Sequence, residues 1–165
     1  MTLKEAVLSE FDAEIAATRH LLERLPDEVF SWKPHEKSMS LGGLATHLAQ
    51  LPHWGTSIMR RDGYDLEFDA TPHAIESQSK REVLDVFDRH VAEVRRTLVD
   101  GSDGQLAAPW ALTRGGHAIM TMPRLSALRR FLLNHLIHHR GQLTVYLRLR
   151  GVPLPSIYGP TADEA

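Results

Sequence analysis

The sequence predicts an all-α fold, a four-helix bundle built by a single domain that spans residues 1–165. Three observations support this prediction. Apolar residues recur three or four positions apart in four long stretches, which is the spacing of an amphipathic helix. Capping residues or a proline precede these stretches, and proline or glycine follows them. The length of 165 residues and the hydrophobic fraction of 42% are sufficient for one core.

The first predicted helix covers residues 3–25. Thr2 and Glu5 have the spacing of a capping box, in which each side chain accepts a hydrogen bond from the other residue's backbone N–H. Pro26 ends the helix, because proline has no backbone N–H to donate and restricts the residue before it.

The second predicted helix is capped by Ser40 and keeps its apolar spacing as far as Ile58. Pro52 lies inside this pattern and predicts a kink or a break near Leu51. The periodicity then disappears over residues 61–77, where glycine, aspartate and proline punctuate the chain. We therefore expect a longer crossover between the second and third helices.

The third helix begins after a capping box that starts at Ser79 and ends in a turn-forming run at residues 100–104. Residues 105–122 contain a Gly-Gly pair between short apolar flanks, which suits a small hairpin or an ordered loop. The fourth helix runs from Pro123, where the missing N–H costs nothing, to about Leu149. Four such helices with connections of mixed length are typical of a bundle.

Charge and composition exclude several classes of protein. The 19 Lys and Arg residues against 21 Asp and Glu give a formal charge of −2, without the basic face of a nucleic-acid binder. No stretch approaches the roughly 18 apolar residues of a membrane helix, and the N-terminal residues lack the apolar region of a signal peptide. The absence of cysteine excludes disulfides, thiolate ligands and a cysteine nucleophile. We expect a cytoplasmic protein without nucleic-acid or membrane partners.

Ten histidines remain to be explained, and helical phase separates them. His135 and His139 lie one turn apart on the predicted buried stripe of the fourth helix, so their imidazoles can converge on one ion. A third ligand has to come from another helix, and His47 lies in the middle of the apolar stripe of the second helix. Three imidazoles would leave the fourth position of a tetrahedral ion open for water or substrate, as in catalytic metal sites.

Simpler interpretations stand beside this one. Two histidines four residues apart occur by chance in a histidine-rich helix, and His90, on the third apolar stripe, is better explained as a core histidine with one hydrogen bond. His138 lies at the edge of the stripe, and His53 could line a pocket or simply end the helix. His73 is expected in a loop with a solvated side chain. Arg140 belongs to a set of arginines that predicts a basic, solvated outer face for the fourth helix.

Three sequence features together resemble the DinB-like (YfiT-like) superfamily of metal-binding four-helix proteins. They are Thr46-His47-Leu48, His135-x3-His139-Arg140-Gly141-Gln142, and the Gly151…Pro155…Tyr158-Gly159 tail. The resemblance covers about residues 5–160. It implies a four-helix bundle, often a homodimer, with a divalent ion on His47, His135 and His139, the same residues that the periodicity selects. Nothing in the sequence resembles the DNA polymerase that shares the name.

Three alternative functions follow, the first of them implied by the resemblance. Some members resemble thiol-dependent transferases and isomerases that use bacillithiol, mycothiol or glutathione, so we expect a metal-dependent transferase with a small-molecule substrate and a low-molecular-weight thiol cosubstrate. The second function is a metal-dependent hydrolase that uses a metal-bound water. The third is a non-enzymatic, stress-related metal-binding dimer. Imidazole ligands suit zinc and nickel, and also copper and iron, and we expect zinc or nickel.

Overall fold

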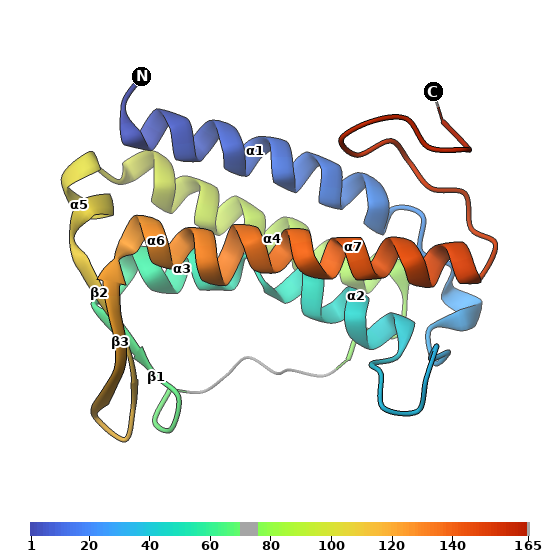
Figure 1. The fold of residues 1–165 in the computed structure, drawn as a ribbon, viewed down its shortest axis with the longest axis horizontal. Helices are drawn as coiled ribbons and strands as arrows, with labels where there is room; N and C mark the ends of the chain where they lie inside the picture. The colour runs from blue at the N-terminus through green and yellow to red at the C-terminus, as the bar shows by residue number, and fades with distance from the viewer. Residues whose placement is uncertain (70–75, 165) are drawn as a thin grey trace.

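The computed structural model describes residues 1–69 and 76–164. Helices form most of this part of the chain, and a small sheet lies at one end (Figure 1). The helical elements are α1 (Leu3–Leu22), the 3₁₀ turn η1 (Asp27–Val29), α2 (Leu41–Gln50), α3 (His53–Arg60), α4 (Lys80–Asp100), α5 (Asp103–Ala107), α6 (Arg124–Leu128), the π-helical turn η2 (Arg129–Leu133) and α7 (Asn134–Leu149). The strands are β1 (Gly63–Asp65), β2 (Pro109–Arg114) and β3 (His117–Pro123).

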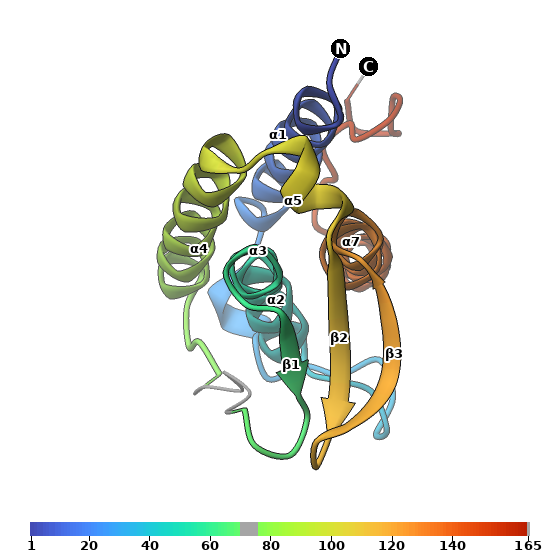
Figure 2. The ribbon, with the colours of Figure 1, turned by 90° about the vertical axis from the view of Figure 1, so that its left-hand side faces the viewer.

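The four predicted helical segments are present and pack around one core. Helix α4 contacts α1, α2 and α3, and α7 contacts both α1 and α2, so the long helices surround a shared apolar interior. Seen along the bundle, α2 and α3 lie between α4 and α7 (Figure 2). Buried leucines line this interior, with Phe11 of α1 and Phe87 of α4 among the largest buried side chains.

The predicted helix boundaries follow from capping chemistry. Thr2 and Glu5 form the expected capping box, and Ser40 accepts a hydrogen bond from the backbone N–H of Gly43 at the start of α2. The predicted interruption near Leu51 is a break, because α2 ends at Gln50 and α3 starts only after Pro52. Pro52 has no N–H to continue the ladder of α2, so the chain starts a second helix there.

The fourth predicted helix is continuous in direction but not uniform. It begins after Pro123 as α6, widens into the π-helical turn η2, and continues as α7. The backbone N–H of Asn134 reaches back to the carbonyl of Arg129, five residues earlier, as a π-helical turn requires. Gly151, with a φ of 70°, follows the end of α7, where a left-handed conformation suits glycine.

The prediction of an all-α fold is wrong, because the described residues include a three-stranded mixed sheet in the order β1-β2-β3. Strand β1 pairs with β2 in parallel, and β2 pairs with β3 antiparallel. Of the two structures expected for residues 105–122, the hairpin is the one observed. Gly115 and Gly116, with φ values of 55° and 78°, form the tight turn between its strands.

The expected crossover between the second and third helices contains strand β1 and residues 76–79, while residues 70–75, including His73, lie outside the described residues. The carboxylate of Asp65 joins β1 to the hairpin. It accepts hydrogen bonds from the hydroxyl of Thr113 and from the backbone N–H groups of Gly115 and Gly116. Although partial desolvation opposes it, these bonds lower the pKa of Asp65 well below its usual range.

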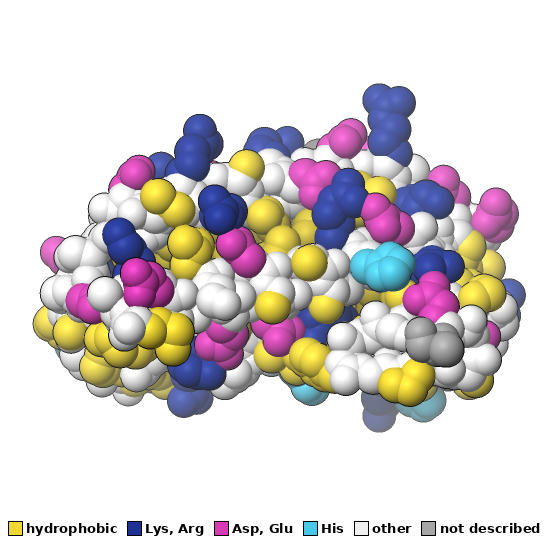
Figure 3. Space-filling view, turned by 90° about the horizontal axis from the view of Figure 1, so that it is seen from above, with side chains coloured by type: hydrophobic (Ala, Val, Ile, Leu, Met, Phe, Trp, Pro, Cys, Tyr) yellow, Lys and Arg dark blue, Asp and Glu magenta, His cyan; other side chains and the backbone are white. Residues whose placement is uncertain are grey.

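Charged residues of both signs are interspersed on the face of the bundle seen in Figure 3. Ion pairs Arg19–Asp88 and Arg95–Asp12 link α1 to α4 on the outside of the bundle. Among the described residues, no helix combines the length and the apolar character needed to cross a bilayer.

Candidate metal centre

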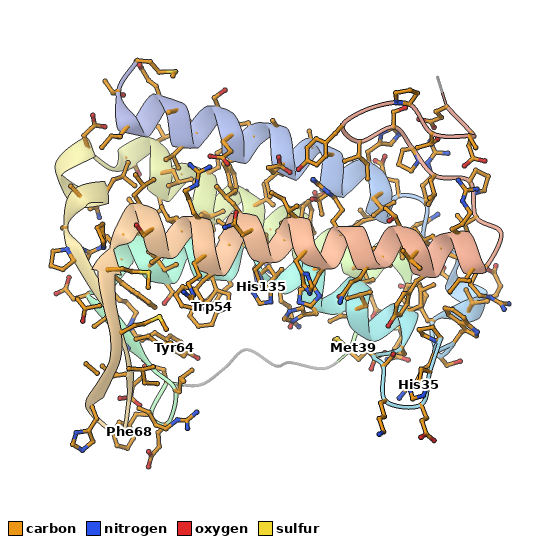
Figure 4. All side chains as sticks on the ribbon, in the orientation of Figure 1. His35, Met39, Trp54, Tyr64, Phe68 and His135 are labelled. Atoms are coloured by element: carbon orange, nitrogen blue, oxygen red, sulfur yellow. The ribbon has the colours of Figure 1, made fainter. Side chains whose placement is uncertain are left out.

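The three predicted ligands come from two helices that pack against each other, His47 from α2 and His135 and His139 from α7. All three side chains are half-buried. The sequence placed His135 and His139 on the buried stripe of the helix, but Leu136 and Leu143 occupy that stripe and the histidines lie at its edge. This position leaves the imidazoles accessible from one side, as an open site requires. Figure 4 shows His135 pointing from α7 toward the side of α2.

The distances within the triad suit a metal ion. The Nε2 atoms of His47 and His135 are 3.4 Å apart, and one ligand atom from each of the three histidines lies within 4.8 Å of the others. Zinc–nitrogen bonds of about 2.0–2.1 Å at a tetrahedral angle separate two ligand atoms by about 3.3 Å. The pair His47–His135 therefore already has the spacing of two ligands on one ion. The ring centroids of the triad are 4.5 to 5.2 Å apart.

Hydrogen bonds to neighbouring groups orient two of the rings. The Nδ1 atom of His139 lies 2.7 Å from Oε1 of Gln142, which can only accept, so Nδ1 is the protonated nitrogen and Nε2 carries the free lone pair. The His135 ring hydrogen-bonds to the backbone of Phe131, one turn earlier. Metal-binding histidines typically donate their other ring nitrogen to an oxygen in this way. The donor set therefore fits a divalent ion.

Burial also keeps these rings in the form that binds metal. Desolvation is the largest cause that lowers the pKa of His135, and the nearby His139 lowers it further. Desolvation likewise lowers the pKa of His139, although the hydrogen bond with Gln142 opposes this change. Neutral imidazole is the metal-binding form, so both rings are ready to bind near neutral pH without first losing a proton.

The other histidines on the helices do not join the triad. His138 is exposed, with its ring centroid 4.8 Å from that of His139, and it is outside the group whose ligand atoms converge. His53 of α3 and His90 of α4 form a separate pair, with their ring centroids 5.7 Å apart. The Nδ1 atom of His90 is buried without a hydrogen-bond partner, and burial lowers the pKa of this ring.

Arg140 was predicted on a solvated outer face, and this prediction is wrong. Its side chain is 2% exposed and forms an ion pair of 2.7 Å with Glu14 of α1. It also donates to the backbone carbonyl of Glu14 and to the hydroxyl groups of Thr18 and Tyr158. The Tyr158 hydroxyl in turn donates to the Glu14 carboxylate. Arg140 therefore fastens α7, next to His139, to α1 and the C-terminal tail.

A group of aromatic side chains beside the triad had no predicted functional role. Trp54 of α3 and Phe131 of η2 stack with their ring centroids 5.6 Å apart and their planes inclined by 26°. The spacing of four residues predicts that Phe131 lies on the same face of the helix as His135. Trp54 comes from another helix, and only the tertiary structure brings it next to Phe131.

The fold and the site define a class of protein, a helical bundle with a small sheet and three imidazoles converging between two of its helices. The chain belongs to the DinB family, whose model matches residues 1–165. Among curated proteins it is similar to the uncharacterized protein YrdA of Bacillus subtilis (strain 168), 29% identical over 95% of this chain and 89% of that protein. The uncharacterized protein YjoA of the same strain is 26% identical over 92% and 93% of the two chains.

Solved structures show the same fold. A DinB-like protein from Bacillus cereus ATCC 10987 has a TM-score of 0.73 and 23% identity, and the match covers 93% of this chain and 97% of that one. The structure of YjoA from Bacillus subtilis has a TM-score of 0.71 and 22% identity, with 92% and 96% covered. The family named from the sequence is thus confirmed.

Proposed function

We propose that His47, His135 and His139 bind a divalent metal ion, zinc or nickel, and that the protein is a metal-dependent transferase with a low-molecular-weight thiol as cosubstrate. The observation that carries this proposal is the half-exposed convergence of three imidazoles in a chain without cysteine. Three protein ligands leave room for one more, and an all-imidazole set suits these ions.

A bound divalent ion lowers the pKa of a thiol and so supplies a thiolate at neutral pH. In the transfer, the thiol sulfur forms a bond to an electrophilic carbon of the substrate. The bond from that carbon to its leaving group breaks, the leaving group departs with the electron pair, and the thiol proton goes to solvent. Because no residue of this chain can donate sulfur, the cosubstrate has to provide it.

A recess with polar and apolar lining, one turn along α2 from His47, offers room for such a cosubstrate. It has a volume of about 420 Å³ and is lined by Ser31, Lys33, Met39, Ser40, Gly43 and Glu76. Gly43 lies on α2 one turn before His47 and on the same half-exposed face. Low-molecular-weight thiols carry amino, hydroxyl and carboxyl groups, and the lysine, serine and glutamate side chains of the recess can hydrogen-bond to such groups.

Metal content tests the first part of the proposal. Protein without a histidine tag is purified as wild type, His135→Ala and His138→Ala, and each is subjected to elemental analysis. We expect near-stoichiometric metal in the wild type and in His138→Ala, which changes an exposed histidine of the same helix, and a loss in His135→Ala. Equal metal content in all three proteins would refute the assignment of the ligands.

Turnover tests the second part. The metal-loaded protein is incubated with a general electrophile and, separately, with bacillithiol, mycothiol or glutathione, with His47→Ala as the control. We expect conjugation with one thiol at a rate well above that of the control. Hydrolysis without any thiol would favour the hydrolase instead, and metal binding without either activity would favour a non-enzymatic role. A homodimer also stays a prediction, which sedimentation velocity tests.

A further inference from the structure

Four aromatic rings form a row at the end of the triad that faces the sheet. Tyr64 of β1 lies 4.8 Å from Trp54, Trp54 lies 5.6 Å from Phe131, and Phe131 lies 5.5 Å from Trp110 of β2, measured between ring centroids. Four helical or strand elements therefore contribute to one continuous row of aromatic rings. The guanidinium carbon of Arg61 lies 5.9 Å from the centroid of the Tyr64 ring, and that of Arg130 lies 5.9 Å from the centroid of the Phe131 ring.

The two ends of the row differ from its middle in exposure. Tyr64 is 4% exposed and Trp110 is fully buried, so both are part of the core. Trp54 and Phe131 are only partly buried, and we call these two side chains the aromatic shelf. The buried rings on either side hold the shelf in place, so its faces are ordered before anything binds to them.

The aromatic shelf adjoins the candidate metal centre. Phe131 precedes His135 by four residues, and the His135 ring hydrogen-bonds to the Phe131 backbone. Trp54 lies beside His135 on the same side of the bundle in Figure 4, and Tyr64 lies just beyond Trp54. Phe131 belongs to the π-helical turn η2, a local irregularity of a kind that is frequent at functional sites.

The two sides of the triad are chemically different. The recess one turn along α2 from His47 contains the charged residues Lys33 and Glu76, whereas the aromatic shelf consists of two stacked aromatic rings. A reaction between a polar thiol and an apolar partner needs this asymmetry, because each reactant then has one side of the metal centre on which it binds better.

We propose that the aromatic shelf binds the planar, apolar part of the electrophilic substrate and so makes aromatic or conjugated compounds the preferred substrate class. This inference rests on the proposed transferase function. Flat rings stack on tryptophan and phenylalanine with more attraction than their buried area alone provides, whereas a saturated ring of equal size does not. Preference for a flat ring is thus the property that distinguishes the shelf from an ordinary apolar contact.

The experiment measures binding without any reaction. Benzyl alcohol and cyclohexylmethanol are titrated separately into metal-loaded and metal-free protein, and the indole N–H signals of the three tryptophans are followed by NMR. We expect benzyl alcohol to bind about 3- to 10-fold more tightly than cyclohexylmethanol, the range that ring stacking provides. The indole signal of Trp54 should move, while those of Trp32 and Trp110 should stay in place.

Matched variants complete the test. Trp54→Leu keeps an apolar side chain but removes the flat face, so it should abolish the preference for benzyl alcohol. Trp32→Leu changes a partly buried tryptophan that packs on Tyr146, beyond His139 along α7, and should leave the preference unchanged. If Trp54→Leu does not fold, the comparison of the two probes in the wild type still shows whether the protein prefers a flat ring.

The outcomes separate this inference from the proposed function. Equal affinities for the two probes, or movement of the Trp32 signal in place of Trp54, would overturn the assignment of the shelf. The metal-free protein could keep the full preference for benzyl alcohol while wild type and His135→Ala contain equal amounts of metal. This result would support the aromatic shelf and contradict only the metal site. Normal metal loading without ring preference would contradict only the shelf.

Discussion

Replacement of Arg140 by methionine should destabilise the protein strongly. The methionine keeps much of the apolar stem, but it leaves the Glu14 carboxylate, whose side chain is 12% exposed, without its cation. Removal of one partner from a buried ion pair typically costs about 3–5 kcal/mol. For a domain of this size, such a loss corresponds to a fall in Tm of roughly 6–20 °C.

Urea unfolding of the metal-free protein, followed by circular dichroism, measures this loss without a contribution from bound metal. Arg129→Met is the matched control, because Arg129 of η2 also pairs with a glutamate of α1, Glu10, but is 52% exposed. Exposed pairs are worth at most about 1 kcal/mol, so the control should unfold almost like the wild type.

A double variant separates the charge from the packing. Glu14→Leu combined with Arg140→Met replaces the pair by apolar side chains and should be more stable than Arg140→Met alone, because no buried charge is left unpaired. The reasoning would be refuted if Arg140→Met lost no more stability than Arg129→Met, or if the two substitutions in the double variant were simply additive.

Three further predictions concern the sheet, the histidines and the helix contacts. Asp65→Asn weakens the bonds that hold the hairpin turn, so the amide of Gly116 should exchange its hydrogen faster; an unchanged exchange rate would contradict this role. Burial lowers the pKa of three rings, so the unfolded chain takes up more protons below about pH 6.5, and the free energy of unfolding of the metal-free protein should fall on acidification. These rings are His90, His135 and His139. Urea titrations at about pH 7.5 and 5.5 measure the change, and equal stability would disprove it. Gly55→Ala would push a methyl group into Val94 and Leu132 and should lower the free energy of unfolding by about 1–3 kcal/mol. In Gly141→Ala the added methyl group meets no other atom, so this variant should be more stable than the wild type by about 0.5–1 kcal/mol. Thermal melts should therefore show a lower Tm for the first variant and a higher Tm for the second.

The helices could be predicted because their signals are local. Each capping box or proline acts within a few residues, so Thr2, Ser40, Ser79 and Pro52 determine boundaries without reference to the rest of the chain. Strand β1 could not be predicted in the same way. It has three residues and obtains its hydrogen bonds from β2, which lies almost 50 residues further along the chain.

The triad was selected correctly as a group of neighbours, but its surroundings were not. Spacing showed that His135 and His139 share a face and that His47 is available from another helix. Spacing could not show that the helix contains the π-helical turn η2, which has more residues per turn than an α-helix. As a result, Leu132, Leu136 and Arg140 are the residues that follow one another on the buried side. The burial of Arg140 depends on Glu14, 126 residues away in sequence.

The long separation between the ligands orders the events of biosynthesis. His47 is 88 residues ahead of His135, so it leaves the ribosome well before α7 does. The three imidazoles can meet only when α7 has emerged, and a domain of this kind folds as a unit at that stage. Capture of the proposed metal ion therefore has to wait for α7, and the ions available at that time decide which metal enters.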